Sequence, residues 1–261
     1  MPIGPARMPF LKHLDELRKR IFLIMGVVTV LTIVAYFFTD QIMAFLIEPV
    51  RGSLGGNLPV VFDPLEAMTL RFVLSFWAAI VVSSPLIIWQ SMAFLLPALK
   101  PKERRWFIPT FSAAVVLFIA GAVLAYIVIL PASFDWLIQQ AGGSMRTILR
   151  AESTLTVIEF FLLGFGVAFQ TPIVVFYLVF FGVIKYKKLR ESWRFVYVGI
   201  TIAAAMITPD WSPVSMGALA IAMLILYEGS MLTCRVVLAK KIKAQEAPPV
   251  DEADAIEAAG A

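Results

Sequence analysis

The stretch His13-Leu14-Asp15-Glu16-Leu17-Arg18-Lys19-Arg20 runs directly into an apolar segment from Ile21 to Phe38. The apolar segment has 18 residues, close to the ~20 helical residues that cross the hydrocarbon core of a bilayer. The three consecutive bases before it would hold one end of such a span on one side of the membrane. That task does not require Asp15 or Glu16, so these two acids indicate a second role for the same stretch.

The composition is that of an integral membrane protein. Of 261 residues, 60% are hydrophobic and 15% are charged, whereas soluble domains are about half apolar and about a quarter charged. The single cysteine, Cys234, excludes an intramolecular disulfide and a cysteine metal cluster. The single histidine, His13, lies outside the apolar runs, which argues against a histidine-based intramembrane enzyme. We therefore expect no enzymatic activity, no cofactor and no metal ion.

Six apolar runs are candidate membrane spans. The predicted spans are residues 21–38, 72–99, 106–130, 155–184, 195–207 and 214–238. The first run is longer than the core of a signal peptide and no cleavage site follows it, so it is expected to remain as a span. The fifth run has only 13 residues, but omitting it would place strongly basic segments on opposite sides of the membrane. The predicted fold is all-α, with six transmembrane helices.

The basic residues predict the orientation of these spans. In the six-span arrangement, 18 of the 22 Lys and Arg residues fall on one side, in segments 1–20, 100–105, 185–194 and 235–243. Because cytoplasmic loops are enriched in Lys and Arg, both termini are predicted to be cytoplasmic. The same distribution accounts for the formal net charge of +4, so membrane lipids are expected as surroundings and a nucleic-acid partner is not.

The segments between and after the spans carry further expectations. The outer loops, residues 39–71 and 131–154, are long enough to form short helices over the outer face. Residues 239–261 contain two prolines and a run of acids and alanines, and are predicted to form a disordered tail. Pro85 and Pro172 lie inside long apolar runs and are expected to kink their helices.

The first twenty residues are expected to form an amphipathic segment. Helical spacing places Phe10, Leu14, Leu17 and Ile21 on one face. Such a segment would lie in the cytoplasmic interface before it turns into the first span. On its polar side, Glu16 has two interpretations. It is either a simple i,i+4 partner of Lys12 or Arg20, or an acid that binds something else.

A second acid lies among bases in the first cytoplasmic loop, Phe94-Leu95-Leu96-Pro97-Ala98-Leu99-Lys100-Pro101-Lys102-Glu103-Arg104-Arg105. Two more motifs follow, Phe165-Gly166-Val167-Ala168-Phe169-Gln170-Thr171-Pro172 and Ile207-Thr208-Pro209-Asp210. Together with the leading octapeptide, these motifs resemble the TatC family, and they occur in that family's order across residues 10–238. TatC is the multispanning core subunit of the twin-arginine protein translocase.

The resemblance implies a curved, concave bundle and a receptor for signal peptides that carry two consecutive arginines. In the family, an acid of the leading motif and an acid of the first cytoplasmic loop bind the signal peptide, and they match Glu16 and Glu103 here. We also assign Arg18, Arg105 and Phe94 to the expected signal-peptide binding site. A carboxylate suits this task, because the planar guanidinium group offers paired donors that two carboxylate oxygens can accept.

The polar residues inside the spans depart in part from the family pattern. Gln170 stands where TatC proteins often carry an intramembrane Glu, and glutamine cannot titrate. Glu159 lies on the same helical face and is either a displaced intramembrane acid or an acid at the outer interface. Glu228 matches an acid in the family's sixth span; it is either functional or extends toward the cytoplasm near Arg235.

The remaining candidates are structural, or belong to transport through the resemblance. Asp210 is expected to cap the last span, with Ser212 nearby. Pro49 matches the family's first outer loop, and Tyr126 resembles a position that the family uses in transport. Pro85 and Pro172 are expected to shape the concave bundle.

The resemblance also implies partners, a location and an energy source. The expected partners are TatA-type and TatB-type single-span subunits in an oligomeric complex, in a bacterial or archaeal cytoplasmic membrane. The small residues of the fifth span, such as Gly199 and Ala203, would permit close packing of a partner helix or of the bundle itself. No phosphate-binding loop is present, and the family uses the proton gradient. The alternative function is a secondary transporter of a small solute.

Overall fold

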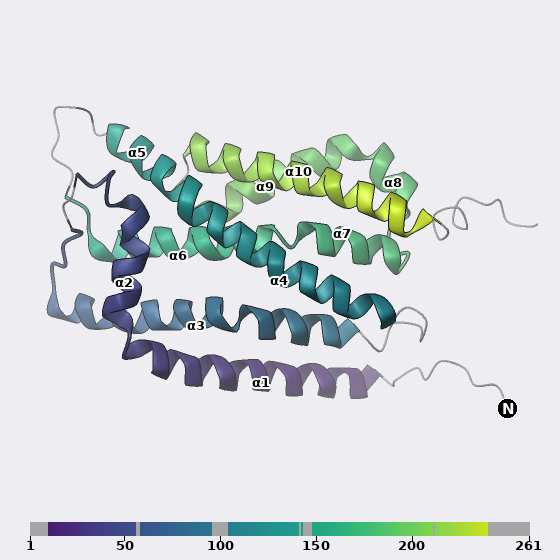
Figure 1. The fold of residues 1–261 in the computed structure, drawn as a ribbon, viewed down its shortest axis with the longest axis horizontal. Helices are drawn as coiled ribbons and strands as arrows, with labels where there is room; N and C mark the ends of the chain where they lie inside the picture. Colours follow the sequence, from purple (N-terminus) through teal and green to yellow (C-terminus); the bar gives the residue numbers. More distant parts are fainter. Residues whose placement is uncertain are drawn as a thin grey trace, which may run out of the picture.

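The chain is a bundle of long helices (Figure 1). The computed structural model describes residues 10–55, 58–95, 104–140, 142, 148–210 and 212–239. The α-helices are α1 (Phe10–Tyr36), α2 (Thr39–Ile47), α3 (Pro64–Leu95), α4 (Phe107–Leu124), α5 (Leu130–Gln140), α6 (Ala151–Ala168), α7 (Thr171–Phe180), α8 (Tyr186–Glu191), α9 (Trp193–Ile207) and α10 (Pro213–Val237). An isolated parallel bridge joins Val60 to Arg150.

Within the described residues, five helical segments are long and apolar enough to cross a membrane. They are Leu14–Tyr36, Pro64–Phe94, Arg104–Gln140, Ala151–Phe180 and Pro213–Val237. The fifth predicted span, residues 195–207, corresponds to α9, an apolar helix of 15 residues that is shorter than the other five segments. The all-α membrane fold is therefore confirmed, whereas the sixth crossing stays a prediction.

The structure corrects the expected course of the first span. α1 runs from Phe10 to Tyr36 as one uninterrupted helix. The amphipathic segment was expected to lie in the interface and then turn into the span, and that expectation is wrong. Helical hydrogen bonding continues through Arg18, Lys19 and Arg20, since all three are good helix formers. The polar start of α1 therefore extends beyond its apolar part along the same axis.

The third expected span is also longer than the sequence suggested. The helix does not end at Leu130, because a 3₁₀ turn (Arg104–Trp106), α4, a π-helical turn (Ala125–Ile129) and α5 follow one another without a break. Pro131 fits near the start of α5 because the π turn rearranges the backbone hydrogen bonds before it. In the first outer loop, α2 and a 3₁₀ turn at Glu48–Val50 form the expected short helices.

The two intramembrane prolines behave differently. Pro172 lies in the first turn of α7, directly after a break at Phe169 and Gln170 that separates α7 from α6. A proline is tolerated there because its missing N–H would have no intrahelical partner. Pro85, in contrast, lies inside α3, which stays helical from Pro64 to Leu95. Pro172 therefore accompanies an interruption of the fourth span, and Pro85 lies within a continuous helix.

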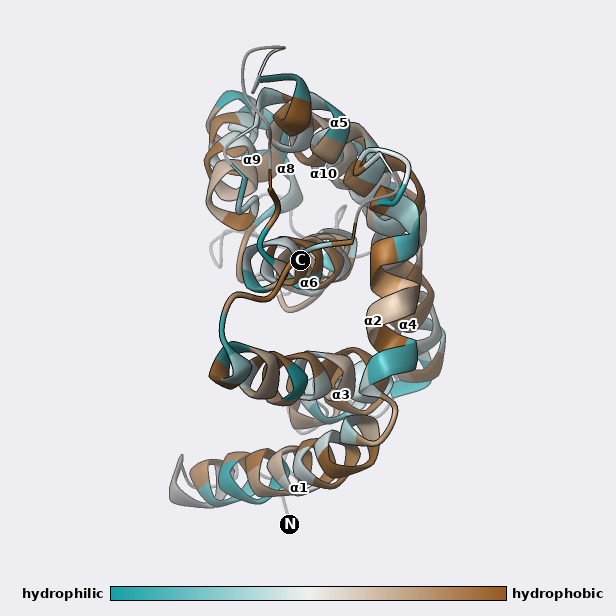
Figure 2. Cartoon of the chain, turned by 90° about the vertical axis from the view of Figure 1, so that its left-hand side faces the viewer, coloured by the Kyte–Doolittle hydropathy of each residue, from teal (hydrophilic) through white to brown (hydrophobic). Residues whose placement is uncertain are grey.

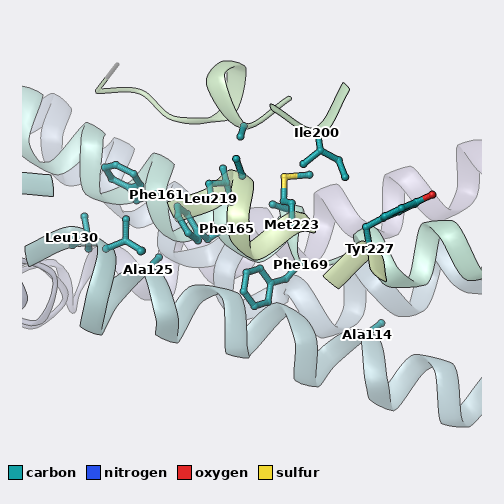
Figure 3. Close-up of a cluster of buried hydrophobic side chains, with 14 of the residues drawn as sticks. Ala114, Ala125, Leu130, Phe161, Phe165, Phe169, Ile200, Leu219, Met223 and Tyr227 are labelled. Carbon is teal, nitrogen blue, oxygen red and sulfur yellow. The ribbon is translucent and has the colours of Figure 1, made fainter. Parts of the chain in front are cut away.

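Viewed end-on, the helices follow a curved path around α6 (Figure 2). α1 packs chiefly along α3, and α10 packs against α7 and α9. A cluster of buried side chains from α4, α6, α9 and α10 forms the core, with Phe161, Phe165, Leu219 and Tyr227 among its largest members (Figure 3). The expected curved bundle is thus the arrangement that the structure has.

Glycines set how closely α4 and α6 approach each other. A Cβ atom added at Gly121 of α4 would lie 2.6 Å from the backbone oxygen of Phe165. One added at Gly166 of α6 would lie 2.7 Å from the ring of Phe118. Small residues permit such close helix contacts in a lipid environment, where packing rather than water exclusion drives association.

The two ends of the bundle differ in charge. The start of α1, the end of α3, the start of α4, α8 and the end of α10 lie at one end (Figure 1). The described parts of the predicted basic segments belong to this end, which we call the basic end. α2, the end of α5 and the start of α6 lie at the opposite end, which we call the outer end (Figure 1).

Candidate functional site

At the basic end, Glu16 and Arg20 form an ion pair on α1. The Nη2 and Nε atoms of Arg20 donate to the Oε1 atom of Glu16 at 2.5 and 3.2 Å. This is the i,i+4 pairing that the first of the two interpretations of Glu16 predicted. The same guanidinium reaches α3, where Nη1 donates to the Oε1 atom of Gln90 at 2.7 Å. Nη2 also approaches the carbonyl oxygen of Ala93 at 3.4 Å.

Arg20 therefore connects the acid to the neighbouring helix. Both of its contacts with Glu16 use Oε1. The other carboxylate oxygen, Oε2, can therefore accept a hydrogen bond from another donor. The side chains of Glu16 and Arg20 are 25% and 23% exposed, so the pair is partly shielded but accessible. Asp15, by comparison, is exposed on the solvent side of the helix. The two neighbouring acids thus have different surroundings, and Glu16 is paired with the arginine that contacts α3.

The other predicted members of this site lie around the pair or outside the described residues. Arg18 packs over the ring of Phe22, 5.6 Å from its centroid. Arg105 packs in the same way over Trp106, at 5.6 Å, where α4 begins. Phe94 lies half-buried near the end of α3, next to Ala93. Glu103 lies outside the described residues, so its position relative to Glu16 remains a prediction.

Gln170 lies in an apolar groove between α3, α4 and α7. Its Nε2 atom donates to the carbonyl oxygen of Ala114 on α4 at 3.0 Å. The groove has a volume of about 490 Å³, and Ser84 of α3 and Phe118 of α4 also line it. Because Gln170 immediately precedes α7, its side chain joins α4 to the break between α6 and α7. The residue has a structural hydrogen bond in the position where the family often carries an acid.

Glu159 is buried on α6 and does not lie in the groove of Gln170. Its side chain faces α3 and α2 instead, and the residue is 4% exposed. Glu159 also lines a cavity toward the outer end with Glu66 and Arg150, so the choice between its two interpretations stays a prediction. Glu159 and Gln170 were predicted to lie on the same helical face, but they line different cavities. The break at Gln170 changes the course of the helix after Ala168.

Glu228 on α10 has two strong partners. Its Oε2 atom accepts from Nη1 of Arg190 on α8 at 2.8 Å, and its Oε1 atom accepts from the hydroxyl of Tyr197 on α9 at 2.7 Å. The hydrogen bond that Arg190 donates to Glu228 is the main cause that raises the pKa of Arg190 above its usual value. The partner is thus Arg190 and not Arg235, which the sequence suggested. This network ties three helices together at the basic end.

Asp210 supports the start of α10 but does not cap it. The cap is Ser212, whose Oγ atom accepts from the backbone N–H of Ser215 at 3.1 Å. Asp210 acts one step further out, because its Oδ1 atom accepts from the hydroxyl of Ser215 at 2.5 Å. The expected direct cap is therefore replaced by a chain of hydrogen bonds in which Ser215 is the middle member.

Tyr126 and Pro49 lie at the outer end. The Tyr126 hydroxyl donates to the carbonyl oxygen of Phe45 at 2.7 Å, and the two rings stack with centroids 4.6 Å apart. This contact joins the π turn after α4 to α2. Pro49 lies in the 3₁₀ turn that ends α2, beside the fully buried Val50. Both residues hold the first outer segment against the bundle.

Sequence reasoning missed three residues that complete these networks. Gln90 accepts a hydrogen bond from Arg20, the partner of Glu16, and Arg190 donates one to Glu228. Glu66 pairs with Arg150 near Glu159. Gln90 carried a usable signal, since a polar amide in a long apolar run needs a partner. Arg190 carried none, because it is one of several bases in a short basic segment.

Comparisons with known proteins agree with this architecture. The family model described as "Sec-independent protein translocase protein (TatC)" matches residues 12–221. The chain is 34% identical over 247 residues to the TatC protein of Deinococcus radiodurans, covering 93% of this chain and 92% of that protein. It is 30% identical over 227 residues to the TatC protein of Synechocystis sp., covering 87% of each.

A solved structure has the same fold. It is described as "Crystal Structure of Twin Arginine Translocase Receptor- TatC", and the two structures align with a TM-score of 0.74 and 26% sequence identity. The alignment covers 86% of this chain and 98% of the other. The family model spans most of the described bundle, and the predicted motifs lie within it. The chain belongs to the TatC family and is a multi-pass membrane subunit of the twin-arginine protein translocase.

Proposed function

We propose that this protein is the receptor subunit that binds twin-arginine signal peptides at its basic end. The observation that carries the proposal is the arrangement of Glu16, which Arg20 holds through Oε1 between α1 and α3. A guanidinium from a peptide would approach Oε2. In this proposal both termini and the basic end are cytoplasmic, as the distribution of Lys and Arg indicates.

The geometry favours arginine over lysine in a bound peptide. A guanidinium carries its N–H donors in a fixed plane, so it can share a carboxylate with a second guanidinium that lies in the same plane. An ammonium group offers a point charge without that fork. The bases around Glu16, such as Arg18 and Lys19, also repel a peptide that brings positive charge without a well-placed donor. Discrimination would therefore come from hydrogen-bond geometry and not from charge alone.

Glu103 would supply the second carboxylate for the second arginine of the motif. It follows the end of α3 in the chain and precedes Arg104 and Arg105, which begin the next helical segment. That segment starts at the same end of the bundle as α1 (Figure 1). Two acids on neighbouring segments match two consecutive arginines. Translocation would then proceed with TatA-type and TatB-type subunits and draw on the proton gradient.

The position of the bound peptide can be tested by crosslinking. A signal peptide with a photoreactive residue beside its Arg-Arg pair is irradiated with the purified protein, and the labelled residues are mapped by mass spectrometry. We expect labels in the first turns of α1 and in the last turn of α3, near Glu16 and Ala93. Glu16→Gln should reduce this labelling, because the amide loses the charge and one acceptor oxygen.

Asp15→Asn is the matched control. It removes an equal charge from the adjacent residue, whose side chain is exposed. The proposal requires that Asp15→Asn leaves the labelling intact. Labels confined to the outer end of the bundle, or equal loss in the two variants, would overturn the receptor site at Glu16.

A further inference from the structure

Glu159 is an acid without a partner inside the bundle. The residue is 4% exposed, and neither of its carboxylate oxygens has a hydrogen-bond partner among the residues that the structure describes. It lies in the third turn of α6, within a candidate membrane span. An ionised carboxylate in such a place would lack both water and a compensating charge, which is strongly unfavourable.

Two cavities meet at this side chain. On one side is an apolar groove of about 370 Å³ that α1, α2, α3 and α6 enclose. The residues that α1, α2 and the turn between them contribute to it are all apolar, including Leu31, Phe38 and Phe45. On the other side is a cavity of about 280 Å³ toward the outer end, which we call the outer vestibule. Glu159 lines both, so its carboxyl group separates a polar space from an apolar one.

The outer vestibule carries an excess of negative charge. Among the described residues, its lining includes the acids Asp63, Glu66 and Glu152 and a single base, Arg150. Arg150 donates from Nε to Glu66 at 2.9 Å and lies 3.0 Å from the carboxylate of Glu152. These acids hold the pKa of Arg150 above its usual value, chiefly through the hydrogen bond to Glu66. The base is therefore committed to its neighbours, and negative charge remains to attract a small cation.

Two other acids in the candidate membrane spans, Glu66 and Glu228, have partners. Glu66 accepts from Arg150 and from the backbone N–H of Phe62 at 3.2 Å. Glu228 accepts from Arg190 and Tyr197. No group of three or more His, Cys, Asp and Glu side chains in the described part of the chain is arranged to hold a metal ion. The cation that suits a single isolated carboxyl is thus a proton.

We propose that Glu159 is a reversible proton-binding site that the outer vestibule serves. In the resting protein the Glu159 side chain is a neutral carboxylic acid in the wall of the apolar groove. Its proton exchanges with the vestibule, where Asp63 and Glu152 provide exposed acceptors and donors. This site is separate from Glu16 and from Gln170, and it does not depend on the proposed binding of signal peptides.

A lipophilic carbodiimide tests this directly, because it reacts with protonated carboxyl groups in apolar surroundings. The acid transfers its proton to a carbodiimide nitrogen, its oxygen bonds to the central carbon, and an acyl shift gives a stable N-acylurea with no leaving group. We treat the purified protein with dicyclohexylcarbodiimide across a pH series and map the adduct by mass spectrometry. We expect Glu159 to be labelled at neutral pH and labelling to fall as the pH rises.

Glu228 and Glu66 are internal controls in the same molecule, since both are intramembrane acids held in ion pairs. They should remain unlabelled, and Glu159→Gln should remove the main adduct. Labelling of Glu228 equal to that of Glu159, or no adduct on Glu159 at any pH, would overturn the proposal. The wild-type pH series stands even if the variant does not fold. Binding of an Arg-Arg peptide to labelled protein should be unchanged, so failure here and failure at Glu16 give different results.

Discussion

Arg20 determines the surroundings of Glu16 at the scale of single residues. Its guanidinium binds Glu16 on its own helix and Gln90 on α3, so one side chain both orients an acid and connects two helices. The sequence offered the Glu16–Arg20 pair as an alternative to a binding role. The geometry makes the two compatible, because Arg20 uses only one carboxylate oxygen.

Gln90→Ala should weaken both the helix contact and the orientation of the acid. Removal of the acceptor for Nη1 of Arg20 is expected to cost about 1 kcal/mol of stability, because the hydrogen bond has a charged donor but is partly exposed. If the binding free energy of an Arg-Arg peptide falls by the same amount, its affinity should be roughly five-fold weaker. Thermal unfolding in detergent and peptide titration measure the two effects. Unchanged values for both would show that Arg20 does not depend on Gln90.

Gln170 permits a second test at this scale. Gln170→Glu would place an acid in the groove between α3, α4 and α7, where the amide now donates to the Ala114 carbonyl. We expect the affinity of Glu16 for an Arg-Arg peptide to stay the same, because the change lies in a different part of the bundle. The titration of the preceding experiment measures it. A large loss of peptide affinity would show instead that the groove and the basic end are coupled.

At the scale of elements, the crossing of α4 and α6 depends on the absence of a side chain at Gly121. A Cβ atom at this position would meet the backbone oxygen of Phe165, which cannot move without moving α6. Gly121→Ala is therefore expected to destabilise the protein by about 1–3 kcal/mol through overpacking. Gly217→Ala in α10 is the matched control, since nothing lies within 4 Å of its added Cβ. Equal melting temperatures for the two variants would contradict the close crossing.

The start of α10 offers a second element-scale prediction. Ser212→Ala removes the cap and leaves the N–H of Ser215 without its acceptor, which is expected to cost about 1 kcal/mol. Asp210→Asn should cost less, because an amide oxygen can still accept from the Ser215 hydroxyl. Melting temperatures of the two variants compare the two costs. A greater loss in Asp210→Asn would mean that the aspartate, and not Ser212, anchors this helix.

For the whole molecule, both ends of the described chain lie at the basic end of the bundle (Figure 1). The predicted topology places this end in the cytoplasm. Single cysteines at Asp15 and Glu191 should react with a membrane-impermeant thiol reagent only in inverted vesicles, whereas one at Ser153 should react in intact cells. The native Cys234 is buried and contributes little background. Reaction of all three positions from the same side would contradict the six-span topology.

The sequence predicted those parts of the structure that depend on local chemistry. Apolar runs located the long helices, and the small outer helices followed from the loop lengths. The continuity of α1 and of the segment from Arg104 to Gln140 was missed, because apolar runs mark where lipid begins and not where a helix ends. The contact of Arg20 with α3 and the partner of Glu228 were missed for another reason. Gln90 and Arg190 are distant in sequence, and only the packing of helices brings them near.

The relative affinity of the protein for an Arg-Arg signal peptide and its Lys-Lys counterpart tests the receptor assignment most directly. In the wild type we expect a preference for Arg-Arg of about ten-fold or more, equivalent to about 1.4 kcal/mol. In Glu16→Gln the ratio should fall toward one, whereas Asp15→Asn should retain it. Equal affinities for the two peptides in the wild type, or a preference that survives Glu16→Gln, would contradict binding at Glu16.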